Sequence, residues 1–441
     1  MFKLLNSLMV LLTVVSLNAY SGGAGLESDP YQIANVSDLK ELMSTKNDWN
    51  KYFIQIEDID IESQTAGITP IGTVPNNGGT AFSGSYMGNH KKISNLKIDM
   101  VNGDKVGLFG YIDGGKISNL TLENVNIIGR DAVGSLAGWL QDGEVLNCSA
   151  SGIVTGAVYV SGFIGDCENG LVENCSTSAS VYGSLGIGGF VGWLQDCEIS
   201  KSCATGNVTL ENEHNTVGGF VGFSGGPEAL VTNSYATGNV IGYNFVGGFA
   251  GNIESGTFEN NYSVGNVNGV GAVGGFVGIT TYGNFTSCYW DVETSGQTES
   301  GAGEGKTTAE MKEEATYVGW DFENIWYFDE NINNGYPSLV PEDVVDITEE
   351  TTLPSTSVLM ENYPNPFNPT TTINYLIPES GNISLSIYNS KGQLVEKLVN
   401  EFQKEGLHKV EFDASHLNSG AYYYTLKTSK GIVTNKMLLI K

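Results

Sequence analysis

Acidic side chains at short, regular spacing are the first residues in the chain that could do chemistry. Between residues 140 and 200, Asp-any-Glu triplets recur as Asp142 with Glu144, Asp166 with Glu168, and Asp196 with Glu198. Two facing carboxyl groups about 5 to 9.5 Å apart can hydrolyse a glycosidic bond, one as acid and the other as base or nucleophile. A row of carboxylates can also bind calcium, which prefers oxygen ligands. Turn aspartates on a solvated edge are the simpler explanation.

The sequence lacks the residues that most other kinds of catalytic or binding site require. None of the four histidines belongs to the His-Glu-any-any-His pair of a zinc peptidase, and no phosphate-binding loop occurs. Between Asp131 and Gly305 the only Lys or Arg is Lys201, and the net charge of the chain is -28. Nucleic-acid binding needs several cations on phosphates, so we expect no such partner. The acidic charge suits solubility outside the cell.

A short motif of apolar residues and glycine repeats through the middle of the chain. Full copies begin at Val133, Val160, Ile187, Val217, Val246 and Val273, and a shortened copy begins at Val106. The first three copies are 27 residues apart. Apolar residues that alternate with small ones predict short strands, and the frequent glycines exclude a helix. One repeat cannot bury both of its faces, so we expect the repeats to stack as a β-helix or β-solenoid, with Val and Phe inward.

Stacking determines how far apart the acidic residues lie. Asp142 and Asp196 occupy equivalent positions two coils apart, which corresponds to about 9.6 Å. This gap is just beyond the range of an inverting hydrolase, so a glycan hydrolase remains an alternative.

Aromatic residues recur at equivalent positions as well. Trp139 and Trp193 share one coil position, and Tyr235 and Tyr262 share another. Facing outward, such rings would form a platform on which a glycan stacks; facing inward, they would form a ladder in the core.

Six cysteines, an even number, permit disulfides in an exported chain. Cys148 and Cys175 occupy equivalent positions in adjacent coils, so their Cα atoms should be about 5 Å apart, within bonding range. The same slot holds Asn, Ser or Cys in other coils. Stacked buried thiols are therefore the alternative to a disulfide between Cys148 and Cys175.

These repeats resemble the GLUG-motif family, named for its Gly-Leu-any-Gly core. The resemblance covers residues 80–290, and its specificity comes from the repetition. The family is known mainly on bacterial surface proteins, including peptidases and adhesins. The resemblance thus implies a surface location without assigning an activity.

Both ends of a solenoid need caps, because an open end exposes unpaired strand edges. We expect residues 21–79 to form the N-terminal cap, with a helix over Val36–Met43, and residues 291–340 to form the C-terminal cap. Aromatic residues between Trp320 and Phe328 should supply the core of the second cap, with glycan stacking as the alternative. Asp329 begins a calcium-like loop, but its glycine comes one position late and Val340 replaces the final glutamate. We expect no cofactor; calcium at Asp142, Asp196 or Asp329 is the alternative.

The N-terminus has the pattern of an export signal. Lys3 precedes an apolar run over Leu4–Leu17, and small residues follow, so residues 1–20 are predicted to be a signal peptide. The run is short for a membrane span, and no other apolar stretch of that kind occurs, so we expect no transmembrane segment. Residues 341–357 are rich in Pro, Thr, Ser and acids and are predicted to be a linker.

Residues 358–441 contain strand-like segments separated by turns, which predicts a small Ig-like antiparallel β-sandwich. Four motifs occur in it in order, and their key residues are Asn365, Pro366, Phe367, Asn368 and Pro369, then Gly392, then Ser419 and Gly420, then Lys436 and Met437. This order resembles the C-terminal sorting domain of type IX secretion cargo. The resemblance implies recognition by outer-membrane export machinery, and usually cleavage by a sortase-like peptidase.

The sequence therefore predicts an all-β protein that is secreted to the outer-membrane surface or beyond it. The leading hypothesis is a non-enzymatic protein of adhesion or envelope structure, with host or environmental glycans or proteins as partners. The alternative is a carbohydrate-binding protein or glycan hydrolase built on a parallel β-helix.

Overall fold

The computed structural model describes residues 20–62, 67–74, 78–210, 216–329, 332–340, 358–359, 367–377, 380–404, 406–429 and 431–441. Strands account for 55% of the fold and helices for 7%. The chain divides into two compact units, Met1–Val344 and Val345–Lys441. Residues 1–19 of the predicted signal peptide and the predicted linker, 341–357, lie outside the described residues.

The first unit begins with a cap that contains one regular helix. Its elements are β1 (Tyr31–Ile33), α1 (Val36–Ser44), η1 (Lys46–Asp48), β2 (Tyr52–Gln55) and β3 (Ile59–Asp60). The helix starts after Asn35, whose side chain accepts hydrogen bonds from the amides of Ser37 and Asp38 at 2.9 and 3.1 Å. Leu39, Leu42 and Met43 are buried in the same hydrophobic core as the coils. The helix predicted over Val36–Met43 is confirmed.

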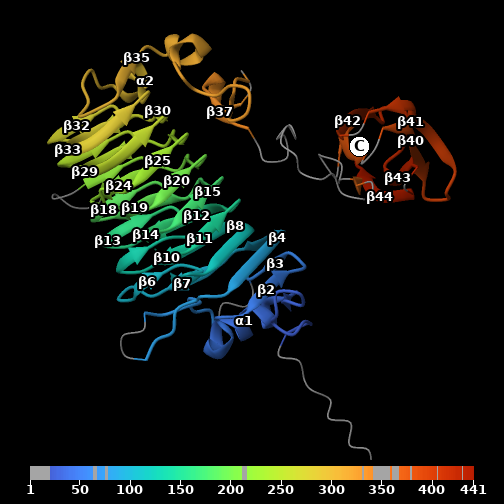
Figure 1. Ribbon diagram of the computed structural model, residues 1–441, viewed down its shortest axis with the longest axis horizontal. Helices are drawn as coiled ribbons and strands as arrows, with labels where there is room; N and C mark the ends of the chain where they lie inside the picture. The colour runs from blue at the N-terminus through green and yellow to red at the C-terminus, as the bar shows by residue number, and fades with distance from the viewer. Residues whose placement is uncertain are drawn as a thin grey trace, which may run out of the picture. The chain divides into compact units, whose positions relative to one another are not determined.

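The coils stack as a β-solenoid of about 7 turns with roughly 27 residues per coil, as predicted. Successive rungs follow one another along the unit from blue to yellow in Figure 1. One sheet of 7 parallel strands holds β6 (Asp104–Val106), β9 (Asp131–Val133), β13 (Val158–Ser161), β18 (Leu185–Gly188), β23 (Thr216–Gly218), β28 (Phe245–Gly247) and β32 (Ala272–Gly274). The remaining coil strands form four further parallel rows.

The first row follows the repeat motif and contains β7 (Phe109–Asp113), β10 (Ala137–Gln141), β14 (Ile164–Glu168), β19 (Val191–Gln195), β24 (Val221–Ser224), β29 (Ala250–Glu259) and β33 (Val277–Thr286). The second contains β4 (Ser85–Ser94), β8 (Lys116–Ile128), β11 (Glu144–Leu146), β15 (Leu171–Glu173), β20 (Glu198–Ser200) and β25 (Leu230–Thr232). The third contains β12 (Ser149–Thr155), β16 (Ser176–Thr177), β21 (Cys203–Ala204), β26 (Tyr235–Ala236), β30 (Tyr262–Ser263), β34 (Tyr289–Asp291) and β35 (Glu304–Lys306). The fourth contains β5 (Lys97–Asp99), β17 (Ser180–Gly183), β22 (Val208–Leu210), β27 (Val240–Ile241) and β31 (Val267–Asn268).

Phenylalanines of the repeat stack along the interior. Phe163, Phe190, Phe220, Phe249 and Phe276 are fully buried, and neighbouring ring centroids are 4.9, 4.6, 4.9 and 4.8 Å apart. The repeat's valines are in register as well, for example Val217 with Val246. The prediction that Val and Phe point inward is therefore confirmed.

The glycines that precede each phenylalanine leave room for neighbouring backbone. A Cβ at Gly218 would lie 2.0 Å from the carbonyl oxygen of Val221, and one at Gly219 would lie 2.1 Å from that of Gly248. Atoms cannot approach so closely, so only glycine fits at these two positions. The motif is glycine-rich because the chain turns tightly against the next coil.

A polar ladder runs through one buried corner. Each side chain in the slot accepts a hydrogen bond from the backbone amide of the equivalent residue one coil before. Cys175 Sγ accepts from Cys148 at 3.4 Å, Ser202 Oγ accepts from Cys175 at 3.2 Å, Ser234 Oγ accepts from Ser202 at 3.2 Å, and Asn261 Oδ1 accepts from Ser234 at 2.8 Å. The slot thus requires a small acceptor, because each of these buried amides takes its partner there.

The structure corrects the predicted disulfide. Cys148 and Cys175 are free buried thiols, and the disulfide joins Cys167 to Cys197, whose Cα atoms are 6.1 Å apart. Cys175 Sγ is already the acceptor for the Cys148 amide. Cys167 lies on β14, whereas Cys197 lies in the turn after β19, so the bonded pair occupies non-equivalent positions in adjacent coils.

The C-terminal cap of the solenoid covers an outer face. Its elements are α2 (Val292–Ser295), η2 (Glu310–Lys312), η3 (Glu314–Thr316), β36 (Trp326–Tyr327), η4 (Asn333–Gly335) and β37 (Ser338–Leu339). Met311, Tyr317, Trp320, Trp326 and Tyr336 form a buried cluster with the outward tyrosines of the third row. The aromatic residues of the cap therefore form core, as expected, but against the side of the coils.

The second unit is built from two antiparallel sheets. The first contains β38 (Val358–Leu359), β39 (Thr370–Ile377) and β42 (Gly406–Asp413), and the second contains β40 (Gly381–Asn389), β41 (Leu394–Gln403), β43 (Gly420–Thr428) and β44 (Gly431–Leu439). Buried residues from both sheets, including Ile373, Phe412, Leu385 and Tyr424, form one core. In the described part of the chain, no helix is long and apolar enough to span a bilayer.

Candidate functional site

The two aspartates considered as a hydrolase pair, Asp142 and Asp196, lie in turns. Asp142, Asn169 and Asp196 all have positive φ, at 50°, 51° and 51°, in successive coils directly after the first-row strands. Asn169 thus separates the two aspartates that were considered as a hydrolase pair. Asp196 Oδ1 accepts a hydrogen bond from the amide of Glu228 at 2.8 Å. These contacts are those of turn residues that stabilise the loop beside them.

The described residues contain no group of three or more His, Cys, Asp or Glu that could hold a metal ion. The backbone carbonyl of Asp329 accepts a hydrogen bond from the amide of Ile332 at 3.0 Å. Residues 330 and 331 of the calcium-like loop lie outside the described residues.

Asp166 differs from Asp142 and Asp196 because it lies on a strand. In β14 it pairs in register with Trp139 on one side and Trp193 on the other, and only 6% of its surface is exposed. The nearest cation, Lys105, has its Nζ 4.0 Å from Asp166 Oδ2. Burial raises the pKa of Asp166 to about 7, and the charge of Lys105 partly opposes this shift. The 27-residue period already indicated this site, since Asp166 is one period from each tryptophan.

The two tryptophans face outward and are half-buried. Trp139 packs against Tyr111 with ring centroids 4.8 Å apart, and Lys105 Nζ lies 4.6 Å from its ring. Trp193 packs against Tyr159 at 4.8 Å. The indole nitrogens of both tryptophans are buried without a hydrogen-bond partner among the described residues. Part of each ring is therefore covered by protein and part remains open to solvent.

Tyr235 and Tyr262 do not form an open glycan platform. Tyr235 is 9% exposed and Tyr262 is 0% exposed, because the C-terminal cap covers both. The hydroxyl of Tyr262 donates a hydrogen bond to the carbonyl of Pro337 at 2.5 Å, and the ring of Tyr235 lies 6.1 Å from that of Trp326. The core alternative is correct for this row.

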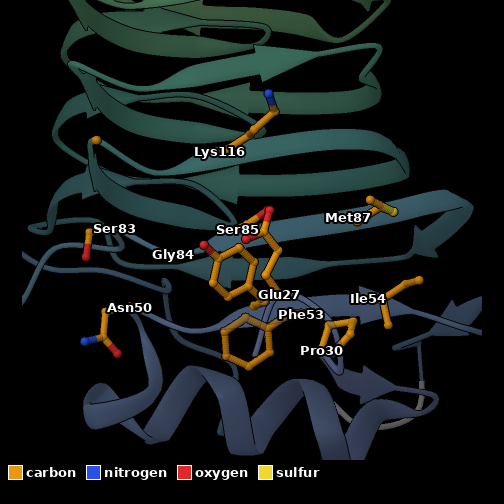
Figure 2. A pocket seen from close by; sticks show the side chains of 12 residues that line it. Glu27, Pro30, Asn50, Phe53, Ile54, Ser83, Gly84, Ser85, Met87 and Lys116 are labelled. Atoms are coloured by element: carbon orange, nitrogen blue, oxygen red, sulfur yellow. The ribbon is translucent and has the colours of Figure 1, made fainter. Parts of the chain in front are cut away.

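A pocket that was not anticipated opens where the N-terminal cap meets the first coils. It has a volume of about 500 Å³ and is lined by Glu27, Pro30, Asn50, Tyr52, Phe53, Ile54, Ser83, Gly84, Ser85, Met87, Gly114 and Lys116. Figure 2 shows Asn50 and Ser83 on one side, Ile54 and Met87 on the other, and Lys116 beyond them. No pattern along the chain indicates this pocket, because its walls come from the cap and from two different coils.

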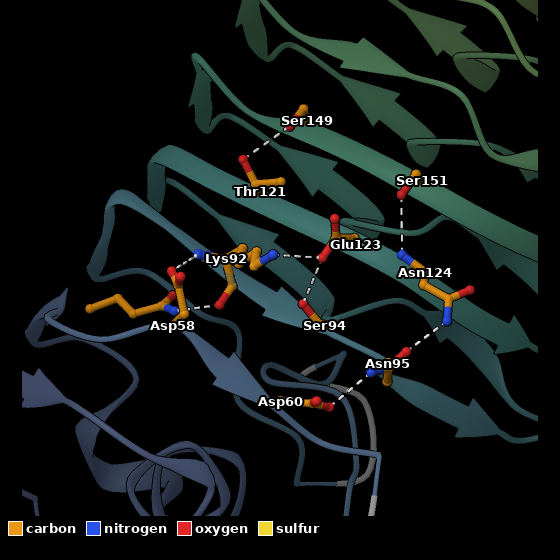
Figure 3. Close-up of polar contacts among 11 residues, drawn as sticks. Asp58, Asp60, Lys92, Ser94, Asn95, Thr121, Glu123, Asn124, Ser149 and Ser151 are labelled. Atoms are coloured by element: carbon orange, nitrogen blue, oxygen red, sulfur yellow. Dashed lines mark hydrogen bonds and ion pairs between the residues drawn. The ribbon is translucent and has the colours of Figure 1, made fainter. Parts of the chain in front are cut away.

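Polar side chains beyond this pocket form hydrogen bonds with one another. Lys92 Nζ bonds Glu123 Oε2 at 2.9 Å, Asn124 Nδ2 donates to Asn95 Oδ1 at 2.6 Å, and Asn95 Nδ2 donates to Asp60 Oδ1 at 2.8 Å (Figure 3). The hydrogen bond from Lys92 lowers the pKa of Glu123, and the one from Asn95 lowers the pKa of Asp60. This network joins β3 to the coils and acts as a structural contact.

In the C-terminal unit, the first and last motifs of the sorting pattern lie side by side. The amide of Phe367 donates to the carbonyl of Leu438 at 2.9 Å, and the amide of Ile440 donates to the carbonyl of Phe367 at 3.0 Å. Phe367 and Met437 are buried, at 2% and 0% exposure. The chain ends of the domain are therefore held together in its core.

The other motif residues lie in turns or on the surface. Gly392 has φ 75° in the turn between β40 and β41, where its amide donates to Asn389 O at 2.9 Å. Ser419 Oγ accepts from the amide of Lys441 at 2.9 Å, directly before Gly420 begins β43. Lys436 is exposed on β44. Asn368 and Pro369 are joined by a cis peptide bond, and Asn365 and Pro366 lie outside the described residues.

Comparison with protein families gives two matches. Residues 361–441 match the family described as Secretion system C-terminal sorting domain. Residues 129–155 and 213–241 match The GLUG motif. The sorting domain implies export by a type IX secretion machinery, to the cell surface or into the medium.

Two curated proteins are similar to part of the chain. Halomucin of Haloquadratum walsbyi is 36% identical over 158 residues, which is 34% of this chain and 2% of that protein. A protein of Evansella cellulosilytica, whose name describes a Gly-rich membrane protein, is 33% identical over 138 residues, which is 29% of this chain and 12% of that protein. The chain thus spans only a small part of either relative.

Among solved structures, an IgA1 protease aligns with a TM-score of 0.43 and 18% identity, over 65% of this chain and 24% of that one. The family matches and the fold agree in each unit. The chain is a β-solenoid protein with GLUG motifs that ends in a secretion system C-terminal sorting domain.

Proposed function

We propose that the protein is a non-enzymatic β-solenoid protein, displayed at the outer-membrane surface or released, that acts in adhesion or cell-envelope structure. The observation that carries the proposal is the connection of a stacked solenoid to a sorting domain in one chain. A stack held by ladders such as that of Phe220 and Phe249 is suited to presenting a surface at a distance from the cell. The partners on the cell side are the type IX machinery and a sortase-like peptidase.

Deletion of residues 358–441 tests whether the sorting domain directs the protein to the cell surface. The truncated chain should accumulate in the periplasm, whereas the full chain should reach the surface or the medium. Surface display of the truncated chain at the normal level would overturn the sorting role. Attachment of cells with and without the full chain to glycan-coated and protein-coated surfaces then measures adhesion.

A second candidate function is carbohydrate binding on the outer face. Trp139 and Trp193 support it, because each is half-buried in an outward row and leaves part of an indole ring for stacking against a sugar. The test is a glycan array with the intact protein and with the double variant Trp139→Ala, Trp193→Ala. Binding that survives both substitutions would rule out this row as the platform.

A further inference from the structure

The pocket between the N-terminal cap and the first coils has the form of a small ligand site. Its volume of about 500 Å³ lies within the range typical of small-molecule pockets. Two large apolar side chains at its edge are unusually open to solvent, with Tyr52 38% and Met87 42% exposed. An exposed aromatic ring beside a cavity is a common feature of sites that bind flat or amphipathic ligands.

The pocket exists because a short side chain lies between two long ones. Tyr52, Ser85 and Lys116 are in register on three successive strands and face outward. Each step between parallel strands is about 4.8 Å, so the Cα atoms of Tyr52 and Lys116 are about 10 Å apart. Only the hydroxymethyl group of Ser85 lies between their side chains in this row. One flat ring that contacts Tyr52 at about 4 Å fits this gap.

The polar groups of the pocket are free to bind such a ring. Four polar side chains that line the pocket make no hydrogen bond with any described residue, namely those of Asn50, Ser83, Ser85 and Glu27. Hydroxyl and amide groups both donate and accept, and a carboxylate accepts two hydrogen bonds from neighbouring hydroxyls. In Figure 2, Asn50 and Ser83 lie on one side of the pocket and Met87 and Ile54 on the other, so one side is polar and the other apolar.

The charges of the site select against anionic ligands. Lys116 already pairs with Glu144, with Nζ 2.6 Å from Oε2, and Glu27 adds a second carboxylate at the pocket. The chain as a whole carries a net charge of -28, which repels acidic polymers at long range. Uronic acids and sulfated sugars are therefore disfavoured.

We propose that this pocket binds one neutral pyranose residue of a glycan, stacked on Tyr52 and hydrogen-bonded by Asn50, Ser83, Ser85 and Glu27. The inference rests on the carbohydrate-binding candidate function, but it assigns the binding to Tyr52, which lies three coils before Trp139 and five coils before Trp193. A pyranose presents an apolar face and a rim of hydroxyls, which matches the apolar and polar sides of the pocket.

The test is calorimetric titration of the full chain with neutral hexasaccharides of glucose, mannose, galactose and N-acetylglucosamine, and with an oligogalacturonate. At least one neutral sugar should bind, and the oligogalacturonate should not. Tyr52→Ala should weaken binding at least tenfold, whereas Tyr52→Phe should keep it. Ser85→Leu should abolish it by filling the gap. Leucine is tolerated in this row, since Leu171 and Leu230 occupy equivalent positions.

Leu171→Ser is the matched control, because it alters the same row away from the pocket and should bind normally. Neutral sugar binding that is unchanged in Tyr52→Ala and Ser85→Leu would overturn the assignment of sugar binding to this pocket. If the tryptophan double variant alone removes that binding, the carbohydrate-binding function stands and only the assignment to the pocket fails. Binding of no neutral sugar would overturn both, while stronger binding of the oligogalacturonate would overturn the selection for neutral sugars.

Discussion

The backbone amide of Cys148 donates a hydrogen bond to the sulfur of Cys175, 3.4 Å away in the next coil. The same relationship continues through Ser202, Ser234 and Asn261 at equivalent positions. These residue types share one property, a compact side chain that can accept a hydrogen bond. The two cysteines are therefore members of a buried acceptor ladder, and their sulfur atoms remain thiols.

Thiol counting tests this arrangement. The unfolded, unreduced protein should contain four reactive thiols, from Cys148, Cys175, Cys203 and Cys288, and full reduction should raise the number to the six cysteines of the chain. Burial raises the pKa of Cys203 to about 11 and that of Cys175 as well, so reaction in the folded state should be slow. Titration with a chromogenic disulfide reagent in denaturant gives the count. Six thiols before reduction would contradict the disulfide between Cys167 and Cys197.

Substitution at Cys175 should distinguish an acceptor from a merely small side chain. Cys175→Ser keeps an acceptor for the Cys148 amide and should change the free energy of unfolding by less than about 1 kcal/mol. Cys175→Val has a similar size but leaves that buried amide unpaired, at a cost of about 1 to 3 kcal/mol. Urea denaturation of both variants gives the comparison. Equal stability of the two variants would show that the hydrogen bond contributes nothing.

Phe220 should be among the most costly core residues to truncate. It is fully buried, and its ring stacks between those of Phe190 and Phe249 with centroids 4.6 and 4.9 Å away. Phe220→Ala should destabilise the solenoid by about 3 to 5 kcal/mol. Phe220→Leu is the matched control, because Leu136 occupies the same slot in an earlier coil, and it should cost markedly less. Thermal unfolding followed by far-UV circular dichroism measures both; equal losses would argue against a stacked ladder.

Asp166 should make the stability of the solenoid depend on pH. Its folded-state pKa is raised from 3.8 to about 7, chiefly by burial, with Glu168 and Asp131 adding to the shift and Lys105 opposing it. The folded protein therefore binds more protons than the unfolded chain between about pH 4 and pH 7, so stability falls as pH rises through this window. The full effect is on the order of 4 kcal/mol at pH 8.

The variant Asp166→Asn isolates this contribution, because its amide does not titrate. It should be more stable than the parent protein at pH 8, and the difference should disappear near pH 4. Tryptophan fluorescence of the folded parent protein should titrate near pH 7, since Trp139 and Trp193 flank the carboxyl group. A stability difference that does not change with pH would show that Asp166 is not protonated in the fold.

Much of the fold could be predicted because it depends on local patterns. The 27-residue period and the inward Phe190 follow from repetition and from the alternation of apolar and small residues, which are visible along the chain itself. The pairing of Cys167 with Cys197 did not follow, since it depends on where side chains point around a turn. The same period also indicates that Asp166 lies in register between Trp139 and Trp193.

The amino-acid sequence by itself determined the stack of coils, its inward ladders and the sorting domain, because each rests on patterns that repeat or that match a family over contiguous residues. Only the tertiary structure decided which outward residues are accessible. Tyr262 is buried because the cap, some 75 residues further along the chain, folds back over it. Tyr52 is open because Ser85 in the next coil is short. Both outcomes depend on contacts between segments that are distant in sequence, and no local pattern encodes such contacts.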